Sequence, residues 1–301
     1  MLLNILNASV EILHDELFQQ KKVSVSVLRL DKIHPVVSGN KLFKLHYFLQ
    51  QGISSAHNTI VTFGGAYSNH LVATAFACQA LGLKSIGIVR GEKPAQLSHT
   101  LQHCLNYSMQ LKFISRETYR KKEEEDFLTE LKNEFGECII IPEGGYHALG
   151  AKGAALIYDL IKNNSYTHIC TATGTATTLA GLLLKGGDKK IISVPVLKGM
   201  NDTEKRINFL LSNNFKTNKL QIFDGYHFGG YAKKTQALTD FMNYLWQQHQ
   251  LPTDFVYTAK LFFAVFDKIK NNYFEEHNNI LCLHTGGLQG NSSLPAGTLL
   301  F

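Results

Sequence analysis

The sequence lacks the cysteine patterns that identify disulfide-rich and zinc-binding proteins. Its five cysteines are an odd number spread over 301 residues, with no Cys-x-x-Cys pair. Neither a disulfide framework nor a cysteine zinc site is therefore expected. Several lie in apolar runs such as "CIIIP" and "ILCLH", where a free thiol is buried like any small apolar side chain. Free thiols without a pairing pattern favour a reducing cytoplasm.

Membrane, metal and hydrolase motifs are absent as well. No apolar run approaches the length of a membrane span, and the N-terminus lacks the basic flank of a signal peptide. The 13 histidines form no His-Glu-x-x-His or comparable pattern, so we expect no metal site. No Gly-x-Ser-x-Gly elbow indicates a serine hydrolase. The net charge of +6 comes from scattered lysines rather than a basic stripe, so nucleic acid is not an expected partner.

What is present is a regular alternation of short β-branched runs and helix-length segments, joined by glycine-containing turns. This alternation predicts an α/β protein whose parallel sheets are covered by helices on both faces. The expected strands are 58–65, 84–91, 110–115, 137–145, 167–174, 190–197, 220–225 and 279–287. The expected helices are 68–82, 96–107, 117–135, 149–164, 177–185, 202–212 and 234–249.

The expected strands can form one sheet, a barrel, or two smaller open sheets. We favour two open, twisted, mostly parallel sheets, because an opening strand pair at about 22–37 precedes the regular alternation instead of joining it. A barrel is the alternative. The smaller α/β domain is expected at 45–150, and the larger one to combine 1–44 with 151–301. Open α/β sheets bind ligands at the carboxyl ends of their strands.

One strand end, in "VTFGGAYSNH", combines glycines with polar residues. Gly64 and Gly65 allow a tight turn, and Ser68 and Asn69 fall at the start of the next helix. Serine and asparagine are common helix caps, so a plain cap is one interpretation. The other is that both residues face a ligand at the strand ends.

A second strand end, in "TATGTATTLAGL", is neither a G-x-G-x-x-G motif nor a Walker loop. The loop from Thr173 to Thr178 nevertheless opens a helix, where successive backbone N–H groups and the helix dipole suit a phosphate. Threonine hydroxyls can add donors. Because the loop has no lysine or metal-binding residue, it favours a monophosphate on an organic cofactor over a nucleoside triphosphate.

Two lysines in "SGNKLFKL", Lys41 and Lys44, stand three residues apart after a Gly-Asn pair. Lysines in such a position usually solvate a helix face. A lysine amine is also a nucleophile toward carbonyls, and pyridoxal phosphate offers both an aldehyde and a monophosphate. The residues alone leave open whether either lysine reacts.

Together these segments resemble the 1-aminocyclopropane-1-carboxylate deaminase/D-cysteine desulfhydrase family of pyridoxal-phosphate enzymes. The resemblance covers most of the chain from about residue 25 to 287. It implies the tryptophan-synthase-β-like fold (fold type II), pyridoxal 5'-phosphate bound by the larger domain in the interdomain cleft, a small amino-acid substrate and a homodimer. The matching segments are "SGNKLFKL", "GGAYSNHLVATAFACQALGL", "IPEGGYHALGAKG", "TATGTATTLAGL", "GGYAKKTQAL", "VYTAK" and "HTGG".

The resemblance also implies roles for individual residues. Lys41 matches the lysine that carries the cofactor, and Lys44 is left with a structural or ion-pairing role. Asn69 matches the asparagine that faces the phenolic oxygen of the cofactor, and Ser68 the catalytic serine near the substrate carboxylate or the proton transfers. The phosphate loop and the two substrate-side tyrosines correspond to Gly174, Thr175, Ala176, Thr177 and Thr178, and to Tyr231 and Tyr257.

Two threonines bear on the reaction. Thr258 stands where ring-opening deaminases have a glutamate at the pyridine nitrogen of the cofactor, and Thr285 matches the desulfhydrase-like branch. A threonine does not stabilise positive charge on that nitrogen as a carboxylate does. The weaker electron sink suits the loss of a good leaving group, so we expect α,β-elimination, for example from D-cysteine to pyruvate, ammonia and sulfide.

Other positions depart from the family pattern. Thr177 replaces a common glycine, Val72 an arginine, and Tyr146 and His147 smaller or amide residues. Ring opening of 1-aminocyclopropane-1-carboxylate to 2-oxobutyrate is the alternative activity. A non-catalytic protein that binds pyridoxal phosphate and a nucleotide-binding α/β protein are alternatives of other classes.

Overall fold

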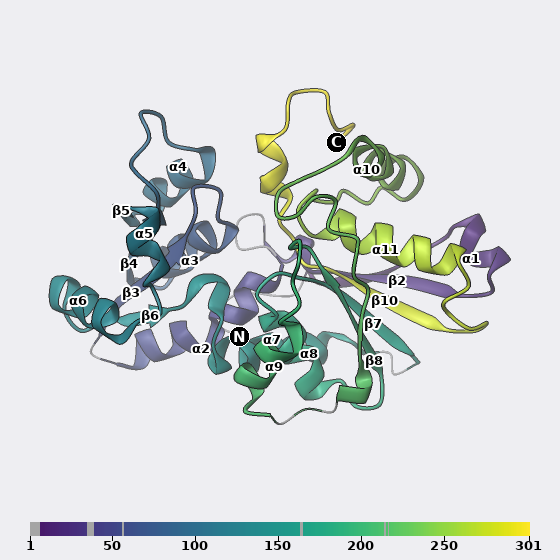
Figure 1. Ribbon diagram of the computed structural model, residues 1–301, viewed down its shortest axis with the longest axis horizontal. Coiled ribbons are helices and arrows are strands. Elements are labelled where there is room, and N and C mark those ends of the chain that lie inside the picture. Colours follow the sequence, from purple (N-terminus) through teal and green to yellow (C-terminus); the bar gives the residue numbers. More distant parts are fainter. Residues whose placement is uncertain (1–6, 35–38, 56, 163–164, 214, 216) are drawn as a thin grey trace.

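The computed structural model describes residues 7–34, 39–55, 57–162, 165–213, 215 and 217–301. Its backbone forms two separate sheets of four and six strands, each flanked by helices (Figure 1). The expectation of two open, mostly parallel sheets is thereby confirmed, and the barrel is excluded. We keep the domain division at 45 and 150 as a proposal.

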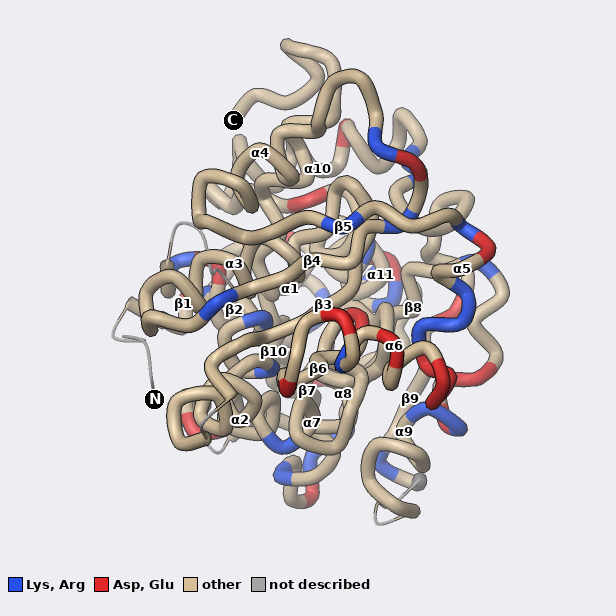
Figure 2. The backbone as a smooth tube through the Cα atoms, turned by 90° about the vertical axis from the view of Figure 1, so that its left-hand side faces the viewer, with Lys and Arg blue, Asp and Glu red and all other residues tan. Residues whose placement is uncertain are grey.

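The four-stranded sheet is built from consecutive parts of the chain, and all of its strand pairs are parallel. Its strand order is β5-β4-β3-β6, with β3 (Thr59–Gly64), β4 (Lys84–Arg90), β5 (Gln110–Ile114) and β6 (Ile139–Ile141). Its helices are α3 (Asn69–Ala80), α4 (His99–Asn106), α5 (Arg116–Arg120) and α6 (Glu125–Phe135). Figure 2 shows Lys or Arg segments interspersed with Asp or Glu segments along α5 and α6.

The six-stranded sheet combines the N-terminal part of the chain with residues after 167, in the order β1-β2-β10-β7-β8-β9. Only β1 runs antiparallel to its neighbour. Its strands are β1 (Ser9–Leu13), β2 (Ser24–Arg29), β7 (His168–Thr173), β8 (Lys190–Pro195), β9 (Leu220–Ile222) and β10 (Asn279–His284). The remaining α-helices are α1 (Glu16–Gln20), α2 (Asn40–Ser54), α7 (Ala148–Ala155), α8 (Thr177–Lys185), α9 (Thr203–Leu211), α10 (Gln236–His249) and α11 (Thr258–Lys270). Short 3-10 helices are η1 (Leu30–Lys32), η2 (Glu143–Gly145), η3 (Leu156–Leu160), η4 (Thr217–Lys219) and η5 (Leu288–Ser293).

The expected opening strand pair at 22–37 is wrong in two respects. The first strand of the pair, β1, lies earlier, and residues that follow β2 form η1 instead of a strand. In addition, β2 joins the six-stranded sheet beside β10 rather than standing apart from it. Residues 35–37 of the expected pair lie outside the described residues. A five-residue edge strand such as β1 is too short for its alternation to stand out in the sequence.

Helix α2 joins the two halves of the molecule, and it carries both lysines of interest. Its apolar face includes Phe43, Leu45 and Leu49, all fully buried. They belong to one core cluster with Ile60 of the smaller sheet and Leu179 of α8. The start of α2 is therefore fixed relative to both β3 and α8. In the part of the chain that the structure describes, no helix has the length and apolarity needed to cross a membrane.

Candidate active site

The N-terminus of α2 is held against the loop that follows β10. Gly39 has a φ of 72°, and a Cβ there would lie 1.8 Å from the carbonyl oxygen of Thr285, so only glycine fits. The N–H of Asn40 donates to that same carbonyl at 3.3 Å. Lys41 is thereby placed beside the "HTGG" segment. Ser38, which precedes Gly39, lies outside the described residues.

Lys41 lies in the first turn of α2 with its amine near the start of α11. Its Nζ donates to Asn40 Oδ1 at 2.8 Å and lies 5.7 Å from the ring centroid of Tyr257. Burial lowers the pKa of Lys41 to about 8, although the negative charge of Asp254 opposes this shift. A substantial fraction of the amine is consequently neutral, and nucleophilic, near pH 8.

Asn40 connects Lys41 to the threonine loop. Its Nδ2 donates to Thr178 Oγ1 at 2.8 Å, which bridges the first turns of α2 and α8. At the start of α8, Ala176 has the left-handed φ of 65° and no side chain caps the helix. Uncapped N–H groups at a helix start suit an anion. Thr177 is the first residue of α8, and its Oγ1 lies 3.0 Å from Thr175 Oγ1. Because the left-handed residue is Ala176, the β-branched Thr177 is accommodated without strain.

Lys44 is a buried cation beside the same loop. Its side chain is only 6% exposed, and its Nζ donates to the carbonyl oxygen of Gly144 at 3.2 Å. A Cβ at Gly144 would lie 2.9 Å from Thr175 Cγ2, so this backbone touches the loop. Burial and repulsion by Lys41 lower the pKa of Lys44 well below its usual value. Among the described residues no carboxylate pairs with Lys44. The expected ion pair is thus not seen, and the site calls for an anion from outside the chain.

Ser68 and Asn69 lie at the start of α3. Ser68 is the N-cap, and its Oγ accepts from the N–H of Leu71 at 3.3 Å, which leaves its own O–H free to donate. Asn69 Oδ1 is buried without a partner. A Cβ at Gly287 would lie 3.4 Å from Asn69 Nδ2 and 3.3 Å from Asp254 Cγ. The absence of a side chain at Gly287 therefore leaves room for the side chains of Asn69 and Asp254. The capping role and a ligand-facing role are compatible here.

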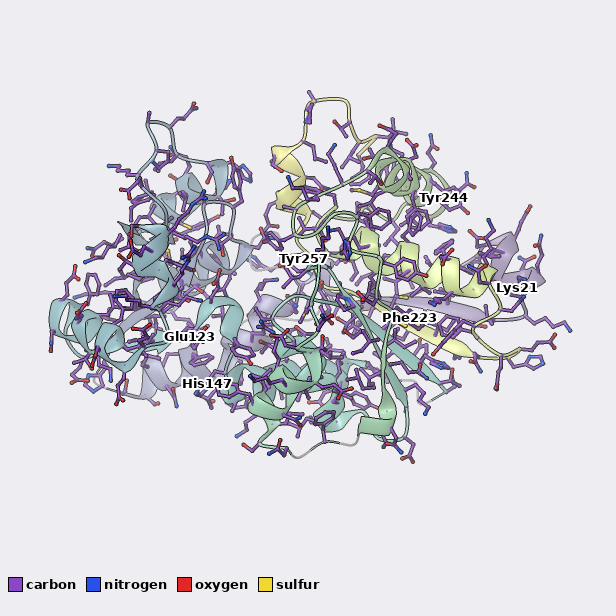
Figure 3. All side chains as sticks on the ribbon, in the orientation of Figure 1. Lys21, Glu123, His147, Phe223, Tyr244 and Tyr257 are labelled. Atoms are coloured by element: carbon purple, nitrogen blue, oxygen red, sulfur yellow. The ribbon has the colours of Figure 1, made fainter. Side chains whose placement is uncertain are left out.

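Two tyrosines lie together near Lys41, and the ring of Tyr257 is the one beside its amine. The rings of Tyr231 and Tyr257 meet edge to face with centroids 6.1 Å apart. A Cβ at Gly174 would lie 3.2 Å from Tyr257 Cε1, so Tyr257 also touches the start of the threonine loop. Burial raises the pKa of both hydroxyls, and the neighbouring Tyr231 hydroxyl raises that of Tyr257 further. Figure 3 shows Tyr257 between the two halves of the molecule.

The start of α11 is organised by Asp254, a residue that sequence reasoning missed. Asp254 is fully buried, and its carboxylate accepts four hydrogen bonds. Oδ2 accepts from the N–H groups of Val256 and Tyr257, each at 2.9 Å. Oδ1 accepts from Thr258 N at 2.9 Å and Thr258 Oγ1 at 2.7 Å. An aspartate just before a helical segment often marks the start of a helix, so the sequence does contain a weak indication of the role of Asp254.

The "HTGG" segment rests on a buried polar network. His284 is fully buried, and its Nε2 donates to the carbonyl oxygen of Pro252 at 2.7 Å. Its Nδ1 lies 3.2 Å from Asp31 Oδ1, and Arg29 binds the same carboxylate with two nitrogens. Burial acts to raise the pKa of Asp31, but Arg29 and His284 hold it below its usual value. Thr285 follows His284 and is buried. Its carbonyl oxygen accepts the hydrogen bond from the N–H of Asn40.

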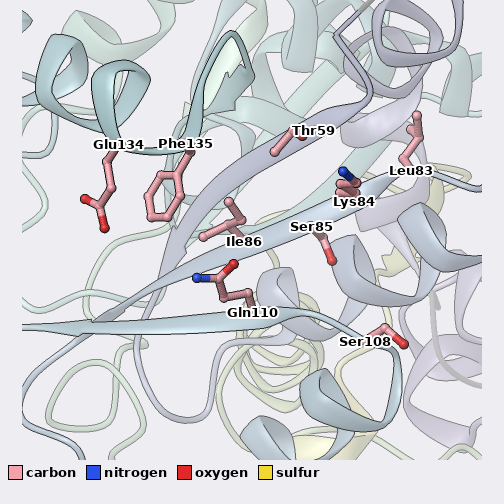
Figure 4. A pocket seen from close by; sticks show the side chains of 9 residues that line it. All are labelled: Thr59, Leu83, Lys84, Ser85, Ile86, Ser108, Gln110, Glu134 and Phe135. Carbon is pink, nitrogen blue, oxygen red and sulfur yellow. The ribbon is translucent and has the colours of Figure 1, made fainter.

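A separate surface cavity of about 690 Å³ lies at the amino ends of the smaller sheet (Figure 4). Thr59, Lys84 and Gln110 begin β3, β4 and β5, and all three line it. None of the residues predicted from the sequence to form a site lies there. Most of the predicted site residues lie instead at the starts of α2, α3, α8 and α11, while Tyr231 lies in the loop before α10 and Thr285 follows β10.

Comparison with known proteins identifies what this arrangement is similar to. The family described as "Pyridoxal-phosphate dependent enzyme" matches residues 12–286. The putative 1-aminocyclopropane-1-carboxylate deaminase of Thermotoga maritima is 30% identical over 89% of this chain and 89% of that protein. The D-cysteine desulfhydrase of Serratia proteamaculans is 25% identical over 86% of each. The crystal structure of an ACC deaminase homologue matches with a TM-score of 0.79 at 24% identity, over 96% of this chain and 92% of that one.

Proposed function

The chain belongs to the pyridoxal-phosphate dependent enzymes, and we propose that it performs α,β-elimination on a small amino acid, with D-cysteine as the best substrate. The products are pyruvate, ammonia and sulfide. The observation that carries the choice of reaction is the arrangement of Thr258 and Asp254 at the start of α11.

The described residues fit pyridoxal phosphate. Among the described residues, Asn69 Oδ1 is buried without a hydrogen-bond partner, and no carboxylate pairs with the buried Lys44 amine. The glycines at 144, 174 and 287 leave room where a Cβ would meet Thr175, Tyr257 and Asn69. Lys41 would hold the aldehyde end of the cofactor, Asn69 its phenolic oxygen, and the threonine loop with Lys44 its phosphate. When bound, the cofactor supplies the electron sink for negative charge at the substrate α-carbon.

Proton transfer falls to residues of the chain. The Lys41 amine, with its pKa lowered to about 8 by burial, takes the α-proton as a base. Tyr231, whose ring meets Tyr257 edge to face, is the hydroxyl that we assign to donate to the departing sulfur. Ser68 donates its hydroxyl to the substrate carboxylate, which the N-terminus of α3 also favours.

The start of α11 favours a good leaving group. A carboxylate that accepts from the ring nitrogen would keep that nitrogen protonated and strengthen the electron sink. Thr258 is a hydroxyl already bonded to Asp254. All four lone-pair sites of Asp254 are occupied by α11 donors, so it has none left for a ring N–H. Elimination of a thiol tolerates a weak sink better than the opening of an unactivated ring.

A substrate panel tests this proposal. We expect purified holoenzyme to release pyruvate and sulfide from D-cysteine, and 1-aminocyclopropane-1-carboxylate to give little or no 2-oxobutyrate. Ring opening is the second candidate, because the Thermotoga maritima relative is named for it. Release of 2-oxobutyrate without turnover of D-cysteine would reverse the order. A fully loaded protein inactive on D- and L-amino acids would instead support a non-catalytic binder.

Lys44 has a testable role as the cation for the phosphate. A charge-assisted hydrogen bond contributes about 1.5–3 kcal/mol, so Lys44→Met is expected to weaken pyridoxal phosphate binding by about 10- to 100-fold. Titration of the apo-protein, followed by visible absorbance, measures this. Binding of pyridoxal, which has no phosphate, should change little. Lys152→Met, on exposed Lys152 of α7, is the matched control. An equal loss for both ligands would argue against a phosphate contact.

A further inference from the structure

A second buried lysine, besides Lys44 of α2, lies on helix α11 one turn after Tyr257. Lys260 is fully buried, and its Nζ donates to two backbone carbonyls, those of His227 and Gly230, each at 2.8 Å. Gly230 directly precedes Tyr231. The first turn of α11 is therefore linked to both tyrosines. It follows directly on Tyr257, and its Lys260 holds the end of the loop that leads into Tyr231.

The backbone of that loop is unusual. Phe228, Gly229, Gly230 and Ala232 all have left-handed φ values, of 50°, 94°, 120° and 53°. Non-glycine residues adopt such values at a cost and need surrounding contacts that hold them. The Phe228 ring also packs edge to face on Phe263 of α11 at 4.9 Å. The Lys260 ammonium and this aromatic pair hold the loop on α11, together with the hydrogen bond from the Tyr226 hydroxyl to Asp267.

The burial of the Lys260 ammonium carries an unfavourable desolvation free energy. Burial lowers its pKa to about 8, and Asp254 at the start of the same helix opposes the shift only in part. Among the described residues no carboxylate pairs directly with its Nζ, whose two acceptors are neutral carbonyls. An apolar side chain of similar size would fill the same space without the desolvation of a charge. Unlike an apolar side chain, the Lys260 ammonium fixes the direction in which the two carbonyls point. It thereby fixes the path of the backbone that leads into Tyr231.

We propose that Lys260 is a positioning residue that sets Tyr231 against Tyr257. This inference rests on the proposed function only in giving Tyr231 a role in proton transfer. The two rings then meet edge to face, which leaves the Tyr231 hydroxyl beside that of Tyr257 for the substrate. Without Lys260 the loop at 227–230 loses both anchoring hydrogen bonds, and the Tyr231 ring is no longer fixed beside Tyr257.

A double-mutant cycle tests the proposal on the holoenzyme with D-cysteine, or with whichever substrate the panel identifies. Lys260→Met and Tyr231→Phe should each lower kcat/KM by about 100-fold, a typical effect of a misplaced proton-transfer group. Most of the loss should fall on kcat rather than KM. Because Lys260 acts through the Tyr231 hydroxyl, the double variant should lose no more than either single one. Multiplicative losses would overturn the proposal.

Readouts other than activity separate this role from general damage. Amide hydrogen exchange of the apo-protein should speed up at 226–233 in Lys260→Met but not in the control Lys270→Met, whose lysine is exposed on the same helix. The visible band of bound cofactor should stay unchanged, because Lys41 is not displaced. Lys260→Arg should recover part of kcat, as should methylammonium added to Lys260→Ala. Unchanged exchange at 226–233 refutes the positioning role. If Tyr231→Phe is fully active while Lys260→Met is not, the role of Tyr231 in the proposed function fails instead.

Discussion

Lys41→Ala is expected to remove both catalysis and the covalent attachment of the cofactor. The variant loses the amine that lies beside Tyr257 at the start of α2. Loss of a base alone costs about 10²- to 10⁴-fold in rate, and loss of the nucleophile adds to it. After addition of pyridoxal phosphate and reduction with borohydride, peptide mass spectrometry should find the pyridoxyl group on Lys41 in the wild type and nowhere in the variant. A reducible band retained in Lys41→Ala would assign the attachment to another lysine.

The lowered pKa of Lys41 gives this experiment a pH dependence with a definite sign. The neutral amine reacts, so the rate of covalent incorporation into the apo-protein should rise with pH and level off above about pH 8. An ordinary lysine, with a pKa of about 10.4, would continue to gain reactivity up to about pH 10. Borohydride trapping at short times over pH 6 to about 10 measures the curve. A midpoint near that of a surface lysine would contradict the burial of the Lys41 amine.

Asp254→Ala is expected to have the largest effect on stability. The change removes the acceptor of three backbone N–H groups and one hydroxyl in a fully buried place. Buried donors left unpaired, together with the loss of a buried charge from its partners, cost about 3–5 kcal/mol. Urea unfolding should therefore shift to a much lower midpoint, and cofactor binding should weaken because Tyr257 and Thr258 lose their anchor.

Two further variants sharpen the Asp254 measurement. Asp240→Ala, at an exposed position on α10, should change the free energy of unfolding by no more than about 0.5 kcal/mol. Asp254→Asn retains the shape but turns an NH₂ group toward N–H donors, so it should fall between the wild type and Asp254→Ala. Identical unfolding midpoints for Asp254→Ala and Asp240→Ala would show that the cap contributes nothing to stability.

The sequence predicted well those parts of the fold and site that have local signals. Alternating strands and helices indicated two parallel sheets, and the small residues before 177 indicated a helix start that α8 now confirms. Helices α2 and α11 were not predicted, and the expected helix at 117–135 is divided into α5 and α6. Most of α11 is buried, and Leu261–Phe266 is an uninterrupted apolar run, which periodicity alone does not distinguish from a buried strand.

The residues that the sequence did not identify owe their roles to distant partners. Lys260 binds two backbone carbonyls about 30 residues away, and backbone acceptors leave no side-chain pattern to find. Lys44 was left with a structural or ion-pairing role because the resemblance matched Lys41 to the cofactor lysine; its contact with the turn at Gly144 has no local signal. Local propensity does not encode such tertiary contacts.

The close approach of Gly39 to Thr285 has a consequence for how this site can evolve. No side chain fits at position 39 while α2 keeps its place, since even a methyl group would overlap the Thr285 carbonyl. Purifying selection at this codon should thus be as strict as at Lys41, although glycine has no functional group to lose. In a set of variant sequences, constancy at position 39 would report the path of the backbone, and constancy at position 41 would report the chemistry.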